Sequence, residues 1–108
     1  MVEQLAAGEA DRRLRAGSPP PLLVDVREAD ERALASIEPS VHIPMHELPR
    51  RLHELPRDRA LIVYCHTGVR SQLVAGFLEQ NGFRGVANLR GGIDAWSREV
   101  DATVARYG

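Results

Sequence analysis

Three short apolar runs separated by longer stretches constrain the fold of this chain more than any other feature. The runs lie at residues 22–26, 60–64 and 86–89. Nearly continuous apolar runs of this length are typical of strands that are buried on both faces of a parallel sheet. Because the stretches between them have room for helices, the chain is expected to form βα units. This predicts an α/β fold with helices on both faces of a mainly parallel sheet.

Spacing predicts where the helices lie. One apolar stripe indicates a helix over residues 70–80, and Asn81-Gly82 supplies a left-handed stop after it. The stripe consists of Leu73, Val74, Phe77 and Leu78. Residues 48–55 have helical spacing too, and Pro49 then fits only in the first turn of that helix. The other expected elements are helices at 2–16, 28–34 and 93–100 and a brief strand at 41–43.

Length and composition fit a single domain spanning residues 1–108. Hydrophobic residues make up 44% and charged residues 27%, as in an ordinary globular protein. A chain of this size buries about two-thirds of the surface that its unfolded form exposes. The core is expected over about residues 22–100, and residues 1–21 are expected to form an N-terminal helix and a proline-rich connector.

Charge and residue usage exclude several function classes. The net charge is −1 and the basic residues are spread along the chain, so no nucleic acid or membrane partner is expected. All 14 basic residues are arginine, which excludes a lysine nucleophile. No signal peptide or membrane-length apolar stretch is visible, and a cytoplasmic location is expected. The single cysteine excludes an intramolecular disulfide and a cysteine-rich metal site.

That lone thiol opens the segment most suited to chemistry. The segment consists of Cys65, His66, Thr67, Gly68, Val69, Arg70 and Ser71. It joins the strongest expected strand to the strongest expected helix, and ligands of parallel sheets bind beyond the carboxyl ends of strands. Backbone N–H groups and the positive end of the helix dipole favour an anion there, and Arg70 and Ser71 can add side-chain donors. The same field favours the thiolate of Cys65, so this residue is the expected nucleophile.

Four stretches, in order, resemble the rhodanese homology domain. They are Asp25-Val26-Arg27-Glu28, Leu48-Pro49 to Leu55-Pro56, Ile62-Val63-Tyr64-Cys65 with Gly68, Arg70 and Ser71, and Leu89-Arg90-Gly91-Gly92 with Trp96. The resemblance runs from about residue 22 to residue 96. It implies a three-layer domain with a central, mainly parallel five-stranded sheet. The chain departs from the family pattern at residues 35–40, where the turn is rewritten but keeps its length.

The resemblance also implies an activity, that of a thiosulfate sulfurtransferase. The Cys65 thiolate would take the outer sulfur of thiosulfate or a related donor and hold it as a persulfide. The sulfur would then pass to cyanide or to a thiol on a small molecule or a protein. Arg70 would hold the anionic donor, and no metal or organic cofactor is expected.

Three alternatives remain open at this point. The same fold and a cysteine followed by arginine also occur in cysteine-dependent phosphatases and arsenate reductases. Their loop is one residue longer than the four residues between Cys65 and Arg70, and Tyr64 replaces the histidine that usually precedes their cysteine. The other two alternatives are a catalytically idle binding module and a persulfide carrier loaded by a partner protein. The sequence leaves the oligomeric state open.

Other polar residues receive weaker predictions. Asp25 and Arg27 follow a strand and can support the site, although hydrogen bonds between loops are the preferred interpretation. His66 can orient the donor or point into solvent. The remaining histidines are interpreted as surface residues rather than metal ligands: His42, His46 and His53. Trp96 is interpreted as a core anchor.

Overall fold

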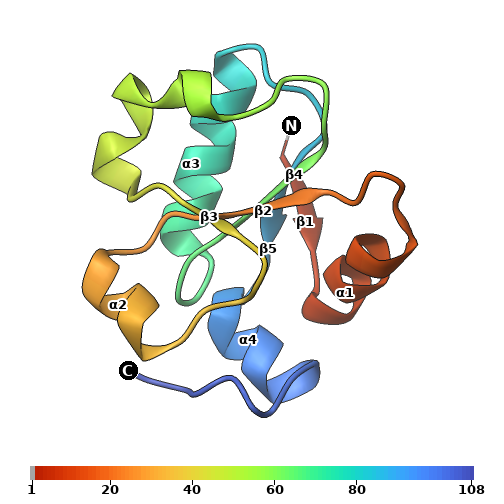
Figure 1. The fold of residues 1–108 in the computed structure, drawn as a ribbon, viewed down its shortest axis with the longest axis vertical. Helices are drawn as coiled ribbons and strands as arrows, with labels where there is room; N and C mark the ends of the chain where they lie inside the picture. The colour runs from red at the N-terminus through yellow and green to blue at the C-terminus, as the bar shows by residue number, and fades with distance from the viewer. Residues whose placement is uncertain (1) are drawn as a thin grey trace.

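The computed structural model describes residues 2–108 and contains one five-stranded sheet with helices around it (Figure 1). The strands are β1 (Glu3–Leu5), β2 (Leu22–Asp25), β3 (Val41–His42), β4 (Leu61–Tyr64) and β5 (Val86–Leu89). The helices are α1 (Ala7–Ala16), α2 (Ala29–Leu34), α3 (Val69–Gln80) and α4 (Gly92–Glu99), with two 3-10 helices, η1 (Met45–Arg50) and η2 (Leu52–Glu54).

The sheet has the order β1-β5-β4-β2-β3, and all four neighbouring pairs are parallel. β4 lies at the centre, and all four of its residues are buried. The registers pair Asp25 with Tyr64 and Val63 with Asn88. The carboxyl ends of β2, β4 and β5 therefore meet at one edge of the sheet. The predicted α/β class and the five-stranded parallel sheet are confirmed.

Two hydrophobic clusters cover the two faces of the sheet and make three layers. On one face, Val24 and Val63 pack with α3 and with residues of the 3-10 segment. On the other face, Leu23 and Ile62 pack with α1 and α4, where Trp96 is buried, as its interpretation as a core anchor requires. Figure 1 shows α3 and the 3-10 helices apart from α1 and α4. Within residues 2–108, no helix is both long and apolar enough to span a bilayer.

The prediction of one helix over residues 2–16 is wrong at its beginning. Residues Glu3–Leu5 form β1, which pairs with β5 at one edge of the sheet, and α1 begins only at Ala7. Pairing with β5 satisfies backbone groups that β5 would otherwise expose at an open edge. Leu5 and Ala10 are buried in the core, so the core begins well before residue 22.

The helix predicted over residues 48–55 is replaced by the two 3-10 helices. The first begins at Met45, which places Pro49 beyond the first turn, where proline removes an α-helical hydrogen bond and its ring meets a preceding carbonyl. Short turns with bonds to the third residue back replace the α-helix, as in the bond from the Arg51 N–H to the Leu48 carbonyl (2.9 Å). Leu48 and Leu55 are nevertheless buried in the same cluster.

The prediction for α3 is confirmed except for Leu73, which is 67% exposed. The buried face consists of Ser71, Val74, Ala75 and Leu78. Ser71 rather than Leu73 continues this face toward the helix start, because residues four apart lie above one another on a helix. Gly82 has φ +88, so the left-handed stop after the helix is confirmed.

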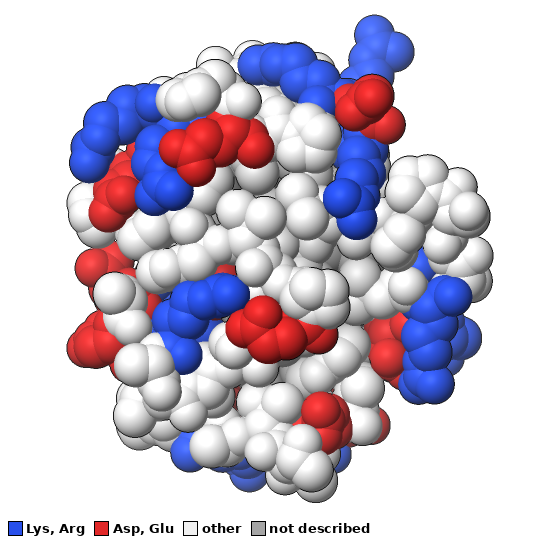
Figure 2. Space-filling model, viewed as in Figure 1, with Lys and Arg blue, Asp and Glu red and all other residues white. Residues whose placement is uncertain are grey.

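Arginine and carboxylate side chains alternate over the face of the molecule seen in Figure 2. Many of them form pairs, as in α1, where Arg12 and Arg13 both contact Glu9. The basic residues of α1 thus belong to mixed-sign ion pairs.

Candidate active site

Cys65 directly follows β4 and is 1% exposed. Its Sγ accepts the N–H of Gly68 at 3.1 Å and the N–H of Ser71 at 3.4 Å. Gly68 can turn the loop because it has φ +104, in the left-handed region that favours glycine. Thr67 and Val69 are exposed at the outside of the same loop. The structure therefore places the thiol where backbone amides and the amino terminus of α3 point at one sulfur atom.

A buried polar chain holds this sulfur from the sheet side. Ser71 Oγ lies 3.3 Å from Cys65 Sγ and donates to Asn88 Oδ1 (2.5 Å). The Asn88 amide donates in turn to the Gly68 carbonyl (3.3 Å) and to Gln4 Oε1 (2.9 Å). Asn88 thus fixes both the hydroxyl beside the thiol and the turn of the loop.

The amino terminus of α4 holds the loop from its other side. The N–H of Ile93 donates to the Cys65 carbonyl (2.9 Å), and the N–H of Asp94 donates to the His66 carbonyl (3.1 Å). Gly92 has φ +61, and a Cβ there would lie 2.4 Å from the His66 oxygen and 2.5 Å from the Cys65 oxygen. Only glycine at this position allows α4 to approach the two loop carbonyls so closely.

Arg70 lies in the first turn of α3 and is paired with a carboxylate from α2. Its two terminal nitrogens donate to the two Glu31 oxygens at 2.6 and 2.8 Å. The Arg70 guanidinium lowers the pKa of Glu31 to about 2. The Tyr107 hydroxyl also donates to Glu31 (2.8 Å), and burial raises the pKa of Tyr107 to about 12. The first turn of α3 therefore carries a charged ion pair capped by a neutral phenol.

The model of the Rhodanese-like domain matches residues 6–99, which include the loop at Cys65 and the elements that hold it. This chain belongs to the rhodanese-like domain family.

Several known proteins are similar to this rhodanese-like domain over most or all of its length. A protein named sulfurtransferase from Allochromatium vinosum is 40% identical over 108 residues, which is 100% of both chains. A putative sulfurtransferase from Bacillus subtilis is 39% identical over 78 residues, 72% of this chain and 75% of that one. The crystal structure of a rhodanese-like domain protein from Staphylococcus aureus superposes with a TM-score of 0.83 at 30% identity and covers 99% and 100% of the two chains. These relatives support a sulfurtransferase.

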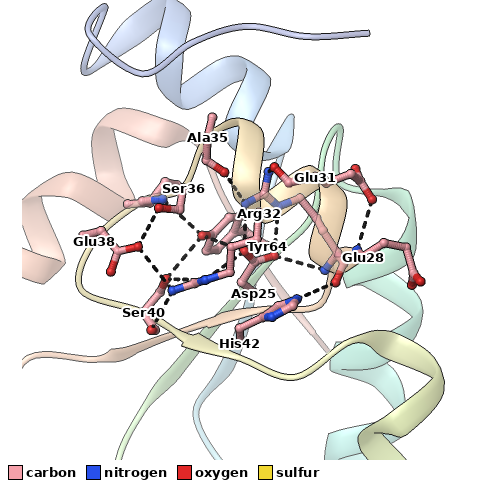
Figure 3. A network of polar contacts seen from close by, with 12 residues as sticks. Asp25, Glu28, Glu31, Arg32, Ala35, Ser36, Glu38, Ser40, His42 and Tyr64 are labelled. Atoms are coloured by element: carbon pink, nitrogen blue, oxygen red, sulfur yellow. Dashed lines mark hydrogen bonds and ion pairs between the residues drawn. The ribbon is translucent and has the colours of Figure 1, made fainter.

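Asp25 and Arg27 form a fully buried pair at the end of β2 in this rhodanese-like domain. The Arg27 guanidinium donates to both Asp25 oxygens at 2.9 and 2.8 Å and to the Ala35 carbonyl at 2.6 Å. Asp25 also accepts from Arg32 (3.0 Å) and from the Tyr64 hydroxyl (3.1 Å), and Figure 3 shows these groups around it. Burial would raise the pKa of Asp25, but the hydrogen bonds from arginine outweigh it and hold that pKa below its ordinary value. The pair ties the end of β2 to α2 and the turn after it.

The rewritten turn at residues 35–40 is anchored on Tyr64. The Tyr64 hydroxyl accepts the N–H of Ile37 (3.1 Å) and lies 3.3 Å from Ser40 Oγ, while it donates to Asp25. Figure 3 shows the turn folded over this hydroxyl. The residue just before Cys65 thus serves to fix the turn.

His66 faces the C-terminal segment. Its ring stacks on Tyr107 with centroids 4.1 Å apart, and its Nε2 donates to the Tyr107 carbonyl (2.9 Å). The sequence left two options open for His66, an orienting role and a side chain that points into solvent. The ring is half-buried, so the second option does not describe it.

The other histidines lie apart from the thiol. His42 is half-buried and donates to the Arg27 carbonyl (2.7 Å), so its interpretation as a surface residue is wrong. His46 is exposed beside Glu28, and His53 is exposed on η2. Among residues 2–108, no three His, Cys, Asp or Glu side chains are grouped to hold a metal ion.

Sequence reasoning missed three residues of the site: Glu31, Asn88 and Tyr107. Asn88 had a usable signal, because an amide inside an apolar strand must find hydrogen-bond partners when it is buried. Glu31 had a weaker one, since Glu28 and Glu31 form a capping box at the start of α2. Tyr107 had none, because its contacts are with residues distant in the sequence.

Gly92→Ala is expected to lower the free energy of unfolding by about 2 kcal/mol or more and to slow sulfur transfer. A left-handed backbone alone costs alanine about 1–2 kcal/mol, and the new Cβ would push against the two loop carbonyls. Gly76→Ala is the matched control, because its Cβ meets nothing within 4 Å in α3 and should stabilise by about 0.5–1 kcal/mol. Urea unfolding measures both, and equal stability of the two variants would contradict the role given to Gly92.

Proposed function

We propose that this chain transfers a sulfane sulfur from thiosulfate or a related donor to a thiol or cyanide acceptor through a persulfide on Cys65. The convergence of the Gly68 and Ser71 N–H groups on Cys65 Sγ carries this proposal. Such donors stabilise negative charge on sulfur, first on the thiolate and then on the persulfide.

The first step forms a sulfur–sulfur bond. The Cys65 thiolate attacks the outer sulfur of thiosulfate, and sulfite leaves with the electron pair of the bond that breaks. The enzyme then carries one additional sulfur as a persulfide anion. No proton or electron has to be supplied from elsewhere.

The second step returns the enzyme to its starting state. A thiolate or cyanide attacks the terminal sulfur, and the electron pair of the breaking bond returns to Cys65. The products are a new persulfide or thiocyanate and the free Cys65 thiolate. Both steps proceed on the protein's own groups.

The loop can stabilise the charge that moves in both steps. The first amides of an α-helix have no acceptor within the helix, and those of α3 follow directly after the cysteine. Preorganised N–H groups of this kind act on developing negative charge as an oxyanion hole does. Ser71 can add its hydroxyl by turning from Asn88 to the sulfur, since it lies 3.3 Å from Sγ.

Turnover assays on the wild-type protein test this function. We expect thiocyanate from thiosulfate and cyanide, release of sulfide when dithiothreitol replaces cyanide, and no hydrolysis of p-nitrophenyl phosphate. Phosphate release or arsenate reduction without sulfur transfer would instead support the phosphatase or arsenate reductase alternative. Loading only by a desulfurase protein, with none by small donors, would support the carrier alternative.

A further inference from the structure

The pairing of Arg70 with a carboxylate is the feature that the function proposed above leaves unexplained. Arg70 is the side chain expected to attract an anionic donor, and it lies in the first turn of α3, just after the loop that begins at Cys65. Yet both of its terminal nitrogens are bonded to Glu31. A bidentate guanidinium–carboxylate pair leaves this edge of the arginine unavailable to the oxygens of a donor.

Glu31 is fixed in this position by several groups. Besides the two bonds from Arg70, it accepts the Tyr107 hydroxyl (2.8 Å) and the Glu28 N–H (3.1 Å). Its side chain is 17% exposed, and that of Arg70 is 31% exposed. The carboxylate is therefore partly shielded from water and held by α2, by α3 and by the C-terminal segment together.

The pair carries no net charge, which changes what the site can attract. An anion attracted by the Arg70 cation is repelled by the Glu31 anion that is bonded to it. The repulsion from Glu31 grows in proportion to the charge of the donor, because the Coulomb energy is a product of charges. A compact dianion is therefore affected about twice as strongly, in free energy, as a monoanion.

We propose that Glu31 is a specificity-determining residue that removes the electrostatic advantage of dianionic sulfur donors at Arg70, so that thiosulfate gains nothing over singly charged donors of the thiosulfonate or persulfide class. The inference rests on the proposed function and names the donor class for the same cysteine. It gives Glu31 no part in bond making.

Two donors differ in charge and little else, which allows a direct test. Thiosulfate has two negative charges, and methanethiosulfonate has one because a methyl group replaces an oxyanion. With the second donor, the Cys65 thiolate takes the terminal sulfur and methanesulfinate leaves with the bonding electron pair. Both reactions give the same Cys65 persulfide.

The experiment measures the second-order rate of persulfide formation with each donor on wild-type and Glu31→Gln protein. Glutamine removes the charge and keeps one acceptor oxygen, which can serve either the Glu28 N–H of the capping box or the Tyr107 hydroxyl. We expect the rate with thiosulfate to rise roughly tenfold and the rate with methanethiosulfonate roughly threefold, so the ratio of methanethiosulfonate to thiosulfate rates falls about threefold. Added salt should reduce the effect of Glu31→Gln on this ratio, because salt screens the charge that the substitution leaves unbalanced.

Two further variants test the direction of the effect and provide a control. Arg70→Gln leaves Glu31 charged without its cation, so the ratio of methanethiosulfonate to thiosulfate rates should rise. Glu54→Gln removes a carboxylate on η2 that pairs with Arg51, and this variant should leave the ratio of the two rates unchanged.

The outcomes separate this inference from the function on which it rests. If Glu31→Gln changes both rates by the same factor, Glu31 only holds the structure together and the inference is overturned while sulfur transfer stands. If the wild type forms no persulfide with either donor, the proposed function fails and the inference fails with it.

Discussion

A Cys65→Ser variant is expected to lose sulfur transfer by roughly three orders of magnitude or more while it keeps the fold. A serine hydroxyl is a weak nucleophile at its own pKa. Among residues 2–108 no basic side chain is hydrogen-bonded to Sγ, whose partners there are two backbone amides and the Ser71 hydroxyl. Thiocyanate production from thiosulfate and cyanide measures the loss.

The fold of this variant serves as its control. Serine can accept the same two N–H groups as the thiol, so its free energy of unfolding should stay within about 1 kcal/mol of the wild type. A stable Cys65→Ser protein that retains turnover would show that the sulfur passes through another group. If Cys65→Ser does not fold, wild-type protein alkylated at Cys65 takes its place in the assay and should be equally inactive.

Asp25→Ala is expected to lower the free energy of unfolding by about 3–5 kcal/mol. Asp25 and Arg27 have no exposed surface, and removal of the carboxylate leaves the Arg27 cation buried without its counter-charge. The same change frees the Tyr64 hydroxyl, which anchors the turn at residues 35–40. Urea unfolding measures the effect, and Asp25→Asn should retain part of the stability if the alanine variant does not fold.

Arg32→Ala is the matched comparison, because Arg32 contacts the same carboxylate but its side chain is 22% exposed. We expect a loss of only about 1 kcal/mol from it. The pKa of Asp25 is lowered in the folded state, so its contribution to stability is present above its ordinary pKa of about 3.9 and is lost as the pH falls below that value. Equal losses from Asp25→Ala and Arg32→Ala at neutral pH would contradict the importance of the buried pair.

The sequence predicted the central elements because their signals are local. β2, β4 and β5 each coincide with a short apolar run, and α3 follows the strongest of them. Burial on both faces leaves such runs without polar positions, which is the pattern that the sequence displays.

The elements that the sequence did not predict depend on distant partners. β1 has only three residues and buries only Leu5, so it shows no alternation of its own, and its strand conformation comes from pairing with β5 at the far end of the chain. The 3-10 segment has the spacing of a helical face, and only the position of Pro49 relative to the helix start decides against an α-helix.

The site divides in the same way. Cys65 and its loop are contiguous, and their order between a strand and a helix was enough to predict that backbone N–H groups converge there. Glu31, Asn88 and Gly92 approach this loop from three other elements, and their contacts follow from the tertiary fold. Arg70 shows the consequence, since its sequence position suggested a free cation and the structure pairs it with Glu31.

Intact mass spectrometry without reductant, after exposure to a sulfur donor and removal of the excess, tests the central claim most directly. The chain has one cysteine, so any persulfide on cysteine must be on Cys65. We predict a gain of one sulfur atom on the wild type with thiosulfate and with methanethiosulfonate, its loss on addition of cyanide, and no gain on Cys65→Ser. An unchanged mass of the wild type with both donors, or an equal gain on Cys65→Ser, would contradict a Cys65 persulfide.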